Sequence, residues 1–252
     1  MIGDPHATPD HPNDRFTLAG KFILEHKPDI VVCMGDFASM DSLSTYDKGK
    51  KSFEGRRIKN DIASAIDANE KLWYPIDTYN AMRRKNGDKQ YRPRKVMTLG
   101  NHEDRINRAI DIDPELEGLI SVDDLQYSHF GWEVHDYNVP VFIEGIAFAH
   151  TFPTGVSGQP ISGVNVARAL LQKNYQSSVV GHNHLRDLYA DTRADGRKIL
   201  GLSVGCFTDE VPRYAAATAR LWWAGLVTLN NVNDGDFEPS FTSLEMLRKR
   251  YG

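Results

Sequence analysis

Short apolar runs that each end in a small or polar cluster limit what this chain can fold into. The runs end at Gly35-Asp36, Gly100-Asn101-His102, His150 and Gly181-His182, after apolar residues at 30–34, 96–99, 141–149 and 178–180. Runs of this length bounded by glycine are typical of buried strands. Because helical patterns separate the runs, we expect an α/β fold with the polar strand ends along one edge of a sheet.

The helical patterns cover residues 16–26, 55–83 and 162–173. Pro75 is expected to kink or divide the second of these helices. Residues 221–229 and 237–244 are predicted to pair as a hairpin. A chain of 252 residues can bury a large core, and it shows no internal repeat, low-complexity tract or linker. We therefore predict a single domain over residues 1–252.

Composition excludes several classes of protein. No apolar run is long enough to span a bilayer, and the first residues lack the basic and apolar regions of a signal peptide. Cys33 and Cys206 each lie in an apolar stretch, so we interpret both as small core residues rather than as a disulfide. A cytoplasmic location and no membrane partner are expected.

Charge is distributed unevenly along the chain. The net charge of −4 does not indicate a nucleic-acid-binding protein. However, basic residues cluster at 48–59 and 83–95, and acidic residues cluster at 111–124. The simple interpretation is that these tracts are solvated faces of helices and loops. The alternative is a basic lip that attracts a phosphorylated substrate.

Five of the nine histidines lie at predicted strand ends, interleaved with Asp4, Asp36 and Asn101. They are His6, His102, His150, His182 and His184. A lone histidine in this position is usually an ordinary polar residue, but five in the same context indicate a metal site. Mixed imidazole and carboxylate ligands favour a transition metal over calcium or magnesium.

A phosphoester is a substrate that such a site can serve. Two cations about 3.5–4 Å apart lower the pKa of a bridging water and neutralise charge on the transferred group. One carboxylate shared by both metals can hold them at this separation. With mixed nitrogen and oxygen ligands on either side of the shared carboxylate, Asp36 is the natural bridge.

The polar clusters also form an ordered set of motifs. The set resembles the calcineurin-like metallophosphoesterase family, whose pattern is D-x-H, GD, GNH with an acidic residue, a lone His, and GHxH. The matching residues are Asp4-Pro5-His6, Gly35-Asp36, Gly100-Asn101-His102-Glu103, His150 and Gly181-His182-Asn183-His184. The resemblance implies a four-layer αββα sandwich, in which two mixed β-sheets are flanked by helices.

The resemblance further implies a role for each matched residue. One metal would be held by Asp4, His6, Asp36 and His184, and the other by Asp36, Asn101, His150 and His182. His102 would be the catalytic residue that stabilises or protonates the leaving oxygen. Arg105 would bind the substrate phosphate or orient Glu103, with a surface salt bridge as the alternative. The implied cofactors are two divalent transition metal ions, manganese above all, with iron, zinc, nickel and cobalt as alternatives.

Three departures from the family pattern bear on function. Only Met1 and Ile2 precede Gly3, so the first strand is unusually short or upstream residues are missing, and the metal held by Asp4 should be the less firmly bound. The residues after Asp36 lack the Asp-Arg-Gly of phosphoprotein phosphatases. Residues 37–95 are longer than the usual connection, and we expect a helical, basic insert that walls the site and selects the substrate.

The leading hypothesis is hydrolysis of a phosphodiester by attack of a metal-bridging hydroxide. Nucleic acid, DNA or RNA, is a candidate substrate, which would make the protein a nuclease. The alternative is a phosphomonoesterase or nucleotide pyrophosphatase that acts on a small substrate. A third hypothesis, from another class, is a catalytically silent metal-binding scaffold. The sequence leaves the oligomeric state open.

Overall fold

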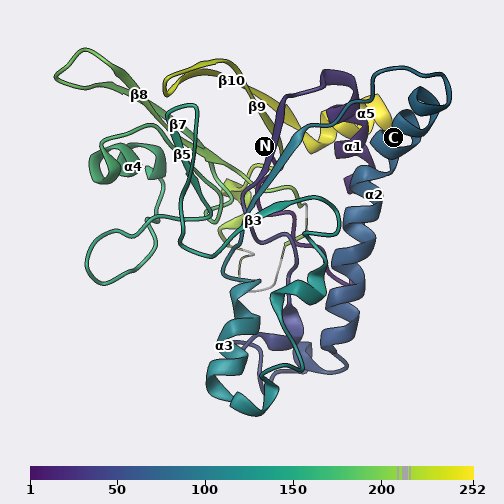
Figure 1. Ribbon diagram of the computed structural model, residues 1–252. Helices are drawn as coiled ribbons and strands as arrows, with labels where there is room; N and C mark the ends of the chain where they lie inside the picture. The colour runs from purple at the N-terminus through teal and green to yellow at the C-terminus, as the bar shows by residue number, and fades with distance from the viewer. Residues whose placement is uncertain (209, 212–214, 216) are drawn as a thin grey trace.

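The computed structural model describes residues 1–208, 210–211, 215 and 217–252 of a mixed α/β fold (Figure 1). A first sheet consists of the parallel strands β1 (Ile30–Cys33), β2 (Arg94–Thr98) and β3 (Glu133–His135). An antiparallel pair, β9 (Gly225–Asn233) and β10 (Asp236–Ser243), forms the predicted hairpin. Ile2 joins this hairpin to the first sheet, because it bridges to Cys33 on one side and to Leu226 on the other.

A second sheet has five strands in the order β4-β5-β6-β8-β7. The central strands β5, β6 and β8 run parallel, and β4 and β7 are added antiparallel at the two edges. The bounds of the strands are β4 Val141–Ile143, β5 Ile146–Ala149, β6 Ser178–Val180, β7 Arg186–Thr192 and β8 Lys198–Val204. Because parallel strands place their carboxyl ends at one edge, the residues that follow β5 and β6 come close together.

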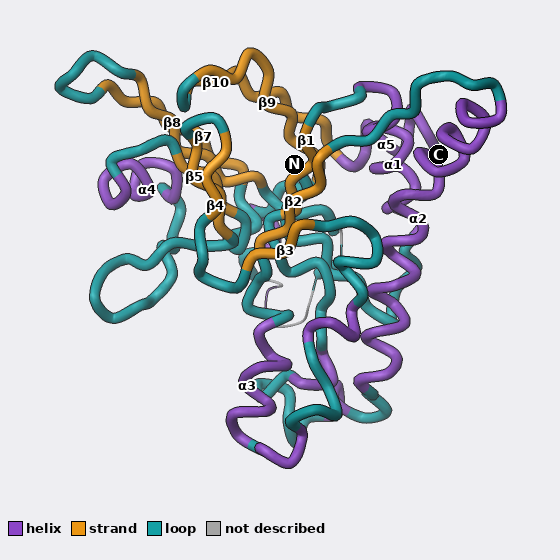
Figure 2. Tube along the Cα trace, in the orientation of Figure 1, coloured by secondary structure: helices purple, strands orange, loops and turns teal. Residues whose placement is uncertain are grey.

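Helices cover the sheets from both sides (Figures 1 and 2). Helix α4 packs against β6, β7 and β8, whereas α1 packs against α2 and α5. The helices are α1 Asp14–His26, α2 Ile58–Lys85, α3 Asp104–Ile112, α4 Val166–Asn174 and α5 Leu244–Tyr251. Short 3-10 turns cover 41–43, 51–53, 114–116, 122–125 and 219–221. Of the helices in the described part of the chain, none is both long and apolar enough to cross a bilayer.

Helix α2 is continuous through Pro75, so the predicted division of this helix is wrong. Leu72, Trp73 and Ile76 are buried in one core, and this packing offsets the hydrogen bond that proline removes. Gly20 of α1 faces the Leu72 carbonyl and the Pro75 ring, where a side chain would clash. Tertiary packing therefore holds together a helix that local sequence weakens.

Alternating residues of the strands enter different hydrophobic cores. In β1, Val31 lies in a core shared with α1 and α2, whereas Val32 lies in a core shared with the second sheet. In β5, Phe148 belongs to that shared core, whereas Ala147 lies in a third core with α4. Cys33 and Cys206 are both fully buried, which confirms their interpretation as core residues. This alternation fixes the register of both sheets, and so fixes where their carboxyl ends lie.

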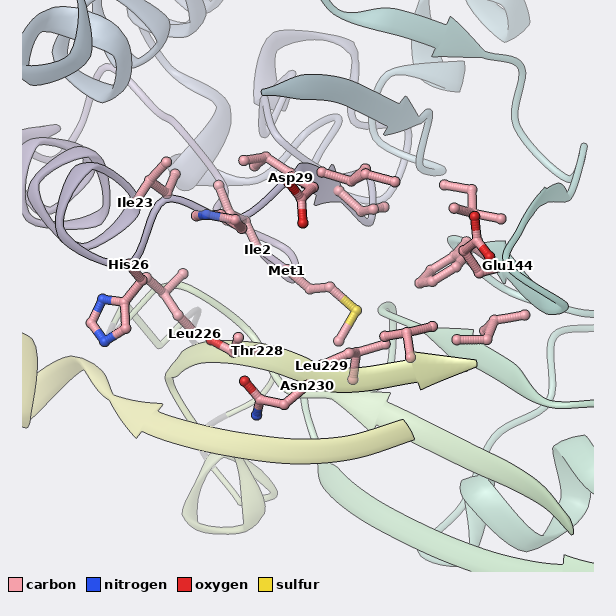
Figure 3. A pocket seen from close by; sticks show the side chains of 18 of the residues that line it. Met1, Ile2, Ile23, His26, Asp29, Glu144, Leu226, Thr228, Leu229 and Asn230 are labelled. Carbon is pink, nitrogen blue, oxygen red and sulfur yellow. The ribbon is translucent and has the colours of Figure 1, made fainter. Parts of the chain in front are cut away.

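A pocket of about 750 Å³ opens at the amino-terminal end of β1. Its walls include Ile23, Ile30 and Leu229, and the Met1 side chain lies within it (Figure 3). Asp36 follows the opposite end of β1, and within the described chain no predicted site residue lines this pocket. This pocket is therefore separate from the histidine-rich strand ends.

Candidate metal centre

Asp4, His6 and His184 form a first group of side chains close enough to share one ion, termed here the Asp4 cluster. The Nε2 atoms of His6 and His184 are 3.1 Å apart, and His184 Nε2 is 3.1 Å from Asp4 Oδ2. Asp4 and His6 follow Ile2, whereas His184 follows β6. The fold thus brings together ligands that are 178 residues apart in sequence.

Asp36, His150 and His182 form a second group, termed the Asp36 cluster. His150 Nε2 lies 3.3 Å from Asp36 Oδ2 and 3.2 Å from His182 Nδ1. The Asn101 Oδ1 atom is 3.1 Å from the same His150 nitrogen. Four loops, which follow β1, β2, β5 and β6, supply these four side chains. The His150 Nδ1–H donates to the Met34 carbonyl at 2.6 Å, which leaves Nε2 as the ligand atom.

The two clusters adjoin at Asp36. A third group of potential ligand atoms consists of Asp36, His6 and His102, so Asp36 lies within reach of members of both clusters. All seven predicted ligands therefore converge on one region at the carboxyl ends of the strands. Geometry of this kind is compatible with metal binding.

The backbone of the ligand loops adopts a conformation that L-amino acids rarely use. Asp4, His6, Asp36, His182 and His184, five of the seven predicted ligands, have positive φ between 35° and 64°. Such residues persist only where surrounding structure over-determines them, and they concentrate at functional sites.

A steric conflict explains why two of the motif positions are glycine. A Cβ on Gly100 would collide with the Asp36 carboxylate, and one on Gly181 would collide with the Asp4 carboxylate. The glycines of the second and third blocks also touch, since Gly35 (φ 87°) packs on the backbone of Gly100. The glycines therefore let the loops approach closely enough to surround both carboxylates.

The hydrogen bonding of the buried polar atoms indicates whether these residues can hold a metal ion. Asp4 is fully buried, and among the described residues no hydrogen-bond donor reaches either of its carboxylate oxygens. His184 Nε2 is near Asp4 Oδ2 but without hydrogen-bond geometry, and the buried His184 Nδ1 also lacks a partner. A buried carboxylate without partners is costly, and a cation would compensate it. The residues present therefore fit a divalent ion.

The histidines of the site differ in the direction in which their surroundings shift the pKa. Burial, and then the charge of His102, lower the pKa of His6 well below its usual range. Burial, and then His150, also lower the pKa of His182. For His150, burial is outweighed by the adjoining Asp36 carboxylate, which raises its pKa to about 10. Despite its own burial, Asp36 has a pKa held well below its usual range by His102 and His150. His6 and His182 are therefore neutral at pH 7, the form in which imidazole binds metals.

His102 lies beside Asp36, with both ring nitrogens engaged. Its Nδ1 is 2.7 Å from the Ser39 carbonyl, and its Nε2 is 3.2 Å from an Arg105 Nη atom. Arg105 also donates to the Ser39 carbonyl at 2.9 Å and approaches Asp41 Oδ1 at 3.4 Å. Burial lowers the pKa of His102 to about 4, and the Arg105 charge acts in the same direction. The Arg105 side chain thus contacts His102 and Asp41, and among the hydrogen bonds of the described residues none joins it to Glu103.

Glu103 is a residue of the third motif for which sequence reasoning assigned no role of its own. Its side chain is fully buried and accepts hydrogen bonds from the amides of Asp36, Gly100 and Ala38 at 2.8–3.0 Å. The Tyr127 hydroxyl donates to it at 3.1 Å. Burial, and then the Asp36 charge, raise the pKa of Glu103. Glu103 therefore ties the loop after β1 to the loop after β2.

We expect Glu103→Ala to destabilise the metal-free protein by at least about 3 kcal/mol, because three buried amides and a hydroxyl lose their acceptor. Urea unfolding followed by circular dichroism measures this loss. Glu103→Gln keeps the shape and one acceptor oxygen, so it should cost less. If Glu103→Ala unfolds at the wild-type urea concentration, Glu103 does not hold these loops.

The two basic tracts lie at different ends of the first sheet. In the 48–59 tract, Arg56 is 3.2 Å from Asp47 and 3.8 Å from Asp41, and Asp41 adjoins Arg105. The 83–95 tract instead leads into the start of β2, whereas Asn101 and His102 follow its other end. Helix α2 packs on α1 through the buried residues described above. The beginning of the 37–95 segment adjoins the site, since Ser39 and Asp41 contact His102 and Arg105.

Trp222 is another site neighbour that sequence reasoning missed. Its ring lies edge-on to His184, with centroids 4.1 Å apart. Lying after β8 and outside every motif, Trp222 offers no spacing signal that would have revealed it.

No family model matches the chain, and a search of curated proteins finds no match to it.

Proposed function

We propose that this chain is a metal-dependent phosphoric ester hydrolase that binds two divalent ions and hydrolyses a phosphodiester. The observation that carries this proposal is the adjoining pair of ligand clusters with Asp36 between them. A single-ion site needs one such cluster, whereas two clusters that meet at a carboxylate suit a dinuclear site. The Asp4 carboxylate oxygens, which accept no hydrogen bond from the described residues, support a cation in the Asp4 cluster as well.

In this proposal each ion has its own set of ligands, and Asp36 belongs to both sets. Asp4, His6 and His184 complete one set, and Asn101, His150 and His182 complete the other. Nitrogen and oxygen donors in this mixture suit manganese, with iron, zinc, nickel or cobalt as alternatives. When bound, the ions would lower the pKa of a shared water and neutralise charge that develops on the phosphoryl group.

We also propose that the chain belongs to the calcineurin-like metallophosphoesterases and has their αββα layer order. Supporting this order, the two sheets share one core, and each sheet has a further core with its own helices. The family assignment is supported by the five motifs, because residues from all five contribute to one cluster or the other.

His102 and Arg105 are proposed to face the phosphate together. Since the pKa of His102 is lowered to about 4, the Arg105 guanidinium carries the positive charge of this pair at neutral pH. A phosphate dianion or diester close to His102 would raise its pKa, because an anion favours the protonated imidazole. His102 could then protonate the leaving oxygen while Arg105 stabilises the negative charge.

The nature of the substrate follows from the surroundings of the site. The 48–59 tract adjoins the site through Arg56 and Asp41, which supports attraction of a polyanion such as DNA or RNA. The position of the 83–95 tract at the far end of β2 favours the second candidate, a small phosphomonoester or nucleotide. A phosphodiester remains the proposed substrate, because the chain lacks the Asp-Arg-Gly of phosphoprotein phosphatases.

A substrate screen with manganese-loaded protein tests this function. We expect hydrolysis of bis(p-nitrophenyl) phosphate and of single-stranded or duplex nucleic acid, with nucleic-acid cleavage falling as salt rises. Mononucleotides, dinucleotides, cyclic nucleotides and p-nitrophenyl phosphate complete the screen. Activity on mononucleotides alone would favour the small-substrate enzyme. Two bound ions without turnover of any compound would identify a scaffold instead.

A further inference from the structure

Arg15 is a buried arginine that the proposed chemistry does not use. It lies in the first turn of α1 and is 7% exposed. Its guanidinium donates to the carbonyl oxygens of Pro5 at 2.6 Å, His6 at 3.1 Å, Pro12 at 3.0 Å and Phe207 at 3.0 Å. A buried cation is costly, so this many charge-assisted hydrogen bonds indicate a defined structural task.

The acceptors belong to two loops that meet at the Asp4 cluster. Pro5 and His6 lie in the first motif, and Phe207 lies in the loop after β8. The amide of Phe207 in turn donates to the Asp4 carbonyl at 3.2 Å. Arg15 therefore completes a hydrogen-bond network that holds the backbone around Asp4.

The other side of the first motif is held by the loop after β1. The His6 amide donates to the Asp36 carbonyl at 2.9 Å, and the Ala7 amide donates to the Phe37 carbonyl at 2.7 Å. Before Asp4, Ile2 bridges to Cys33 and to Leu226. The loop after β1 thus holds one side of the motif, and Arg15 supplies contacts on the side away from Asp36.

The backbone of this motif also requires such support. Asp4 has φ 35° and His6 has φ 49°, which both lie in the sparsely populated left-handed region. The conformation persists only while neighbouring contacts over-determine it. Only a planar fork with several N–H groups can reach carbonyls in three directions, so lysine cannot replace arginine here.

We propose that Arg15 is a positioning residue for the Asp4 cluster, which sets the affinity of that cluster for its ion through the loops at 4–6 and 205–208. The inference rests on the proposed function only in requiring that the chain bind two divalent ions. Arg15 is not among the proposed metal ligands, because its guanidinium binds backbone carbonyls, and its removal should leave the Asp36 cluster intact.

The test is metal binding to Arg15→Met and Arg15→Lys, measured with Mn²⁺ by calorimetry and by electron paramagnetic resonance. Wild type should bind two ions and show the spectrum of a coupled pair. Each variant should bind one ion with wild-type affinity and the other at least about tenfold more weakly, which is the effect expected of an outer-shell partner. At low Mn²⁺ the variants should show the signal of an isolated ion.

Leu170→Ala is the matched control, because Leu170 is buried in the core beneath α4 and lies outside the loops at issue. This variant should lower the melting temperature yet keep two ions of wild-type affinity. Equal weakening of both ions, or of neither, in the Arg15 variants would overturn the proposal. Failure of both variants to fold would also overturn it, by assigning Arg15 to global stability. A wild-type protein that does not bind two ions is a distinct result, since it contradicts the proposed function before any variant is compared.

Discussion

Asp36→Asn is expected to weaken both metal ions at once and to abolish most hydrolysis. The Asp36 carboxylate reaches members of both ligand clusters, and an amide cannot serve as an anionic bridge. Loss of activity should exceed the roughly 100-fold that removal of an outer-shell partner costs. Metal content by mass spectrometry, followed by turnover of bis(p-nitrophenyl) phosphate at increasing Mn²⁺, measures both effects.

A control must show whether the loss of one negative charge elsewhere in the protein weakens metal binding. Asp195→Asn makes the same substitution in the exposed turn between β7 and β8, and should keep full metal content and activity. If Asp36→Asn instead retains two ions at wild-type affinity, Asp36 is not the bridge. Loss of only one ion would place Asp36 in a single cluster.

His102→Ala is expected to keep metal content nearly unchanged while lowering turnover by about 100-fold or more. The Nδ1 of His102 is 2.7 Å from the Ser39 carbonyl and its Nε2 adjoins Arg105, so both nitrogens already have partners other than a metal. The loss should appear in kcat, because this contact develops its full strength only in the transition state.

The effect of His102→Ala should depend on the leaving group of the substrate. Alanine at position 102 should impair substrates with poor leaving groups more than nitrophenyl esters, since nitrophenolate leaves without protonation. His129→Ala, a substitution of an exposed histidine, is the control and should leave both kinds of substrate unaffected. Loss of an ion from His102→Ala would show that His102 is a ligand, as its place in one potential ligand group allows.

Much of the site could be predicted from short motifs, because each motif specifies a structure that forms within a few residues. A buried strand ends, a glycine lets the next backbone approach, and a ligand side chain follows at once. Gly100 shows this clearly, since any side chain there would collide with Asp36. The strands β1, β2, β5 and β6 were predictable for the same reason, because each is a short apolar run bounded by polar residues.

Features that depend on distant packing were not predictable. Pro75 signals a break, yet α2 continues because its buried face packs against α1. The two basic tracts look alike in sequence, but the direction of β2 places the 83–95 tract away from the site. Edge strands such as β3 and β7 are short or largely exposed, so no apolar run in the sequence predicts them.

The sequence by itself determined which side chains form the candidate centre and the order in which the strands deliver them. Ligand type and spacing are local properties, and they are sufficient to indicate a metal site. Only the tertiary structure decided that His102 and Arg105 meet at the Ser39 carbonyl, and that Arg15 joins the loop of Asp4 to Phe207. Ser39 lies 63 residues from His102, and Phe207 lies 192 residues from Arg15, so long-range packing brings these groups together.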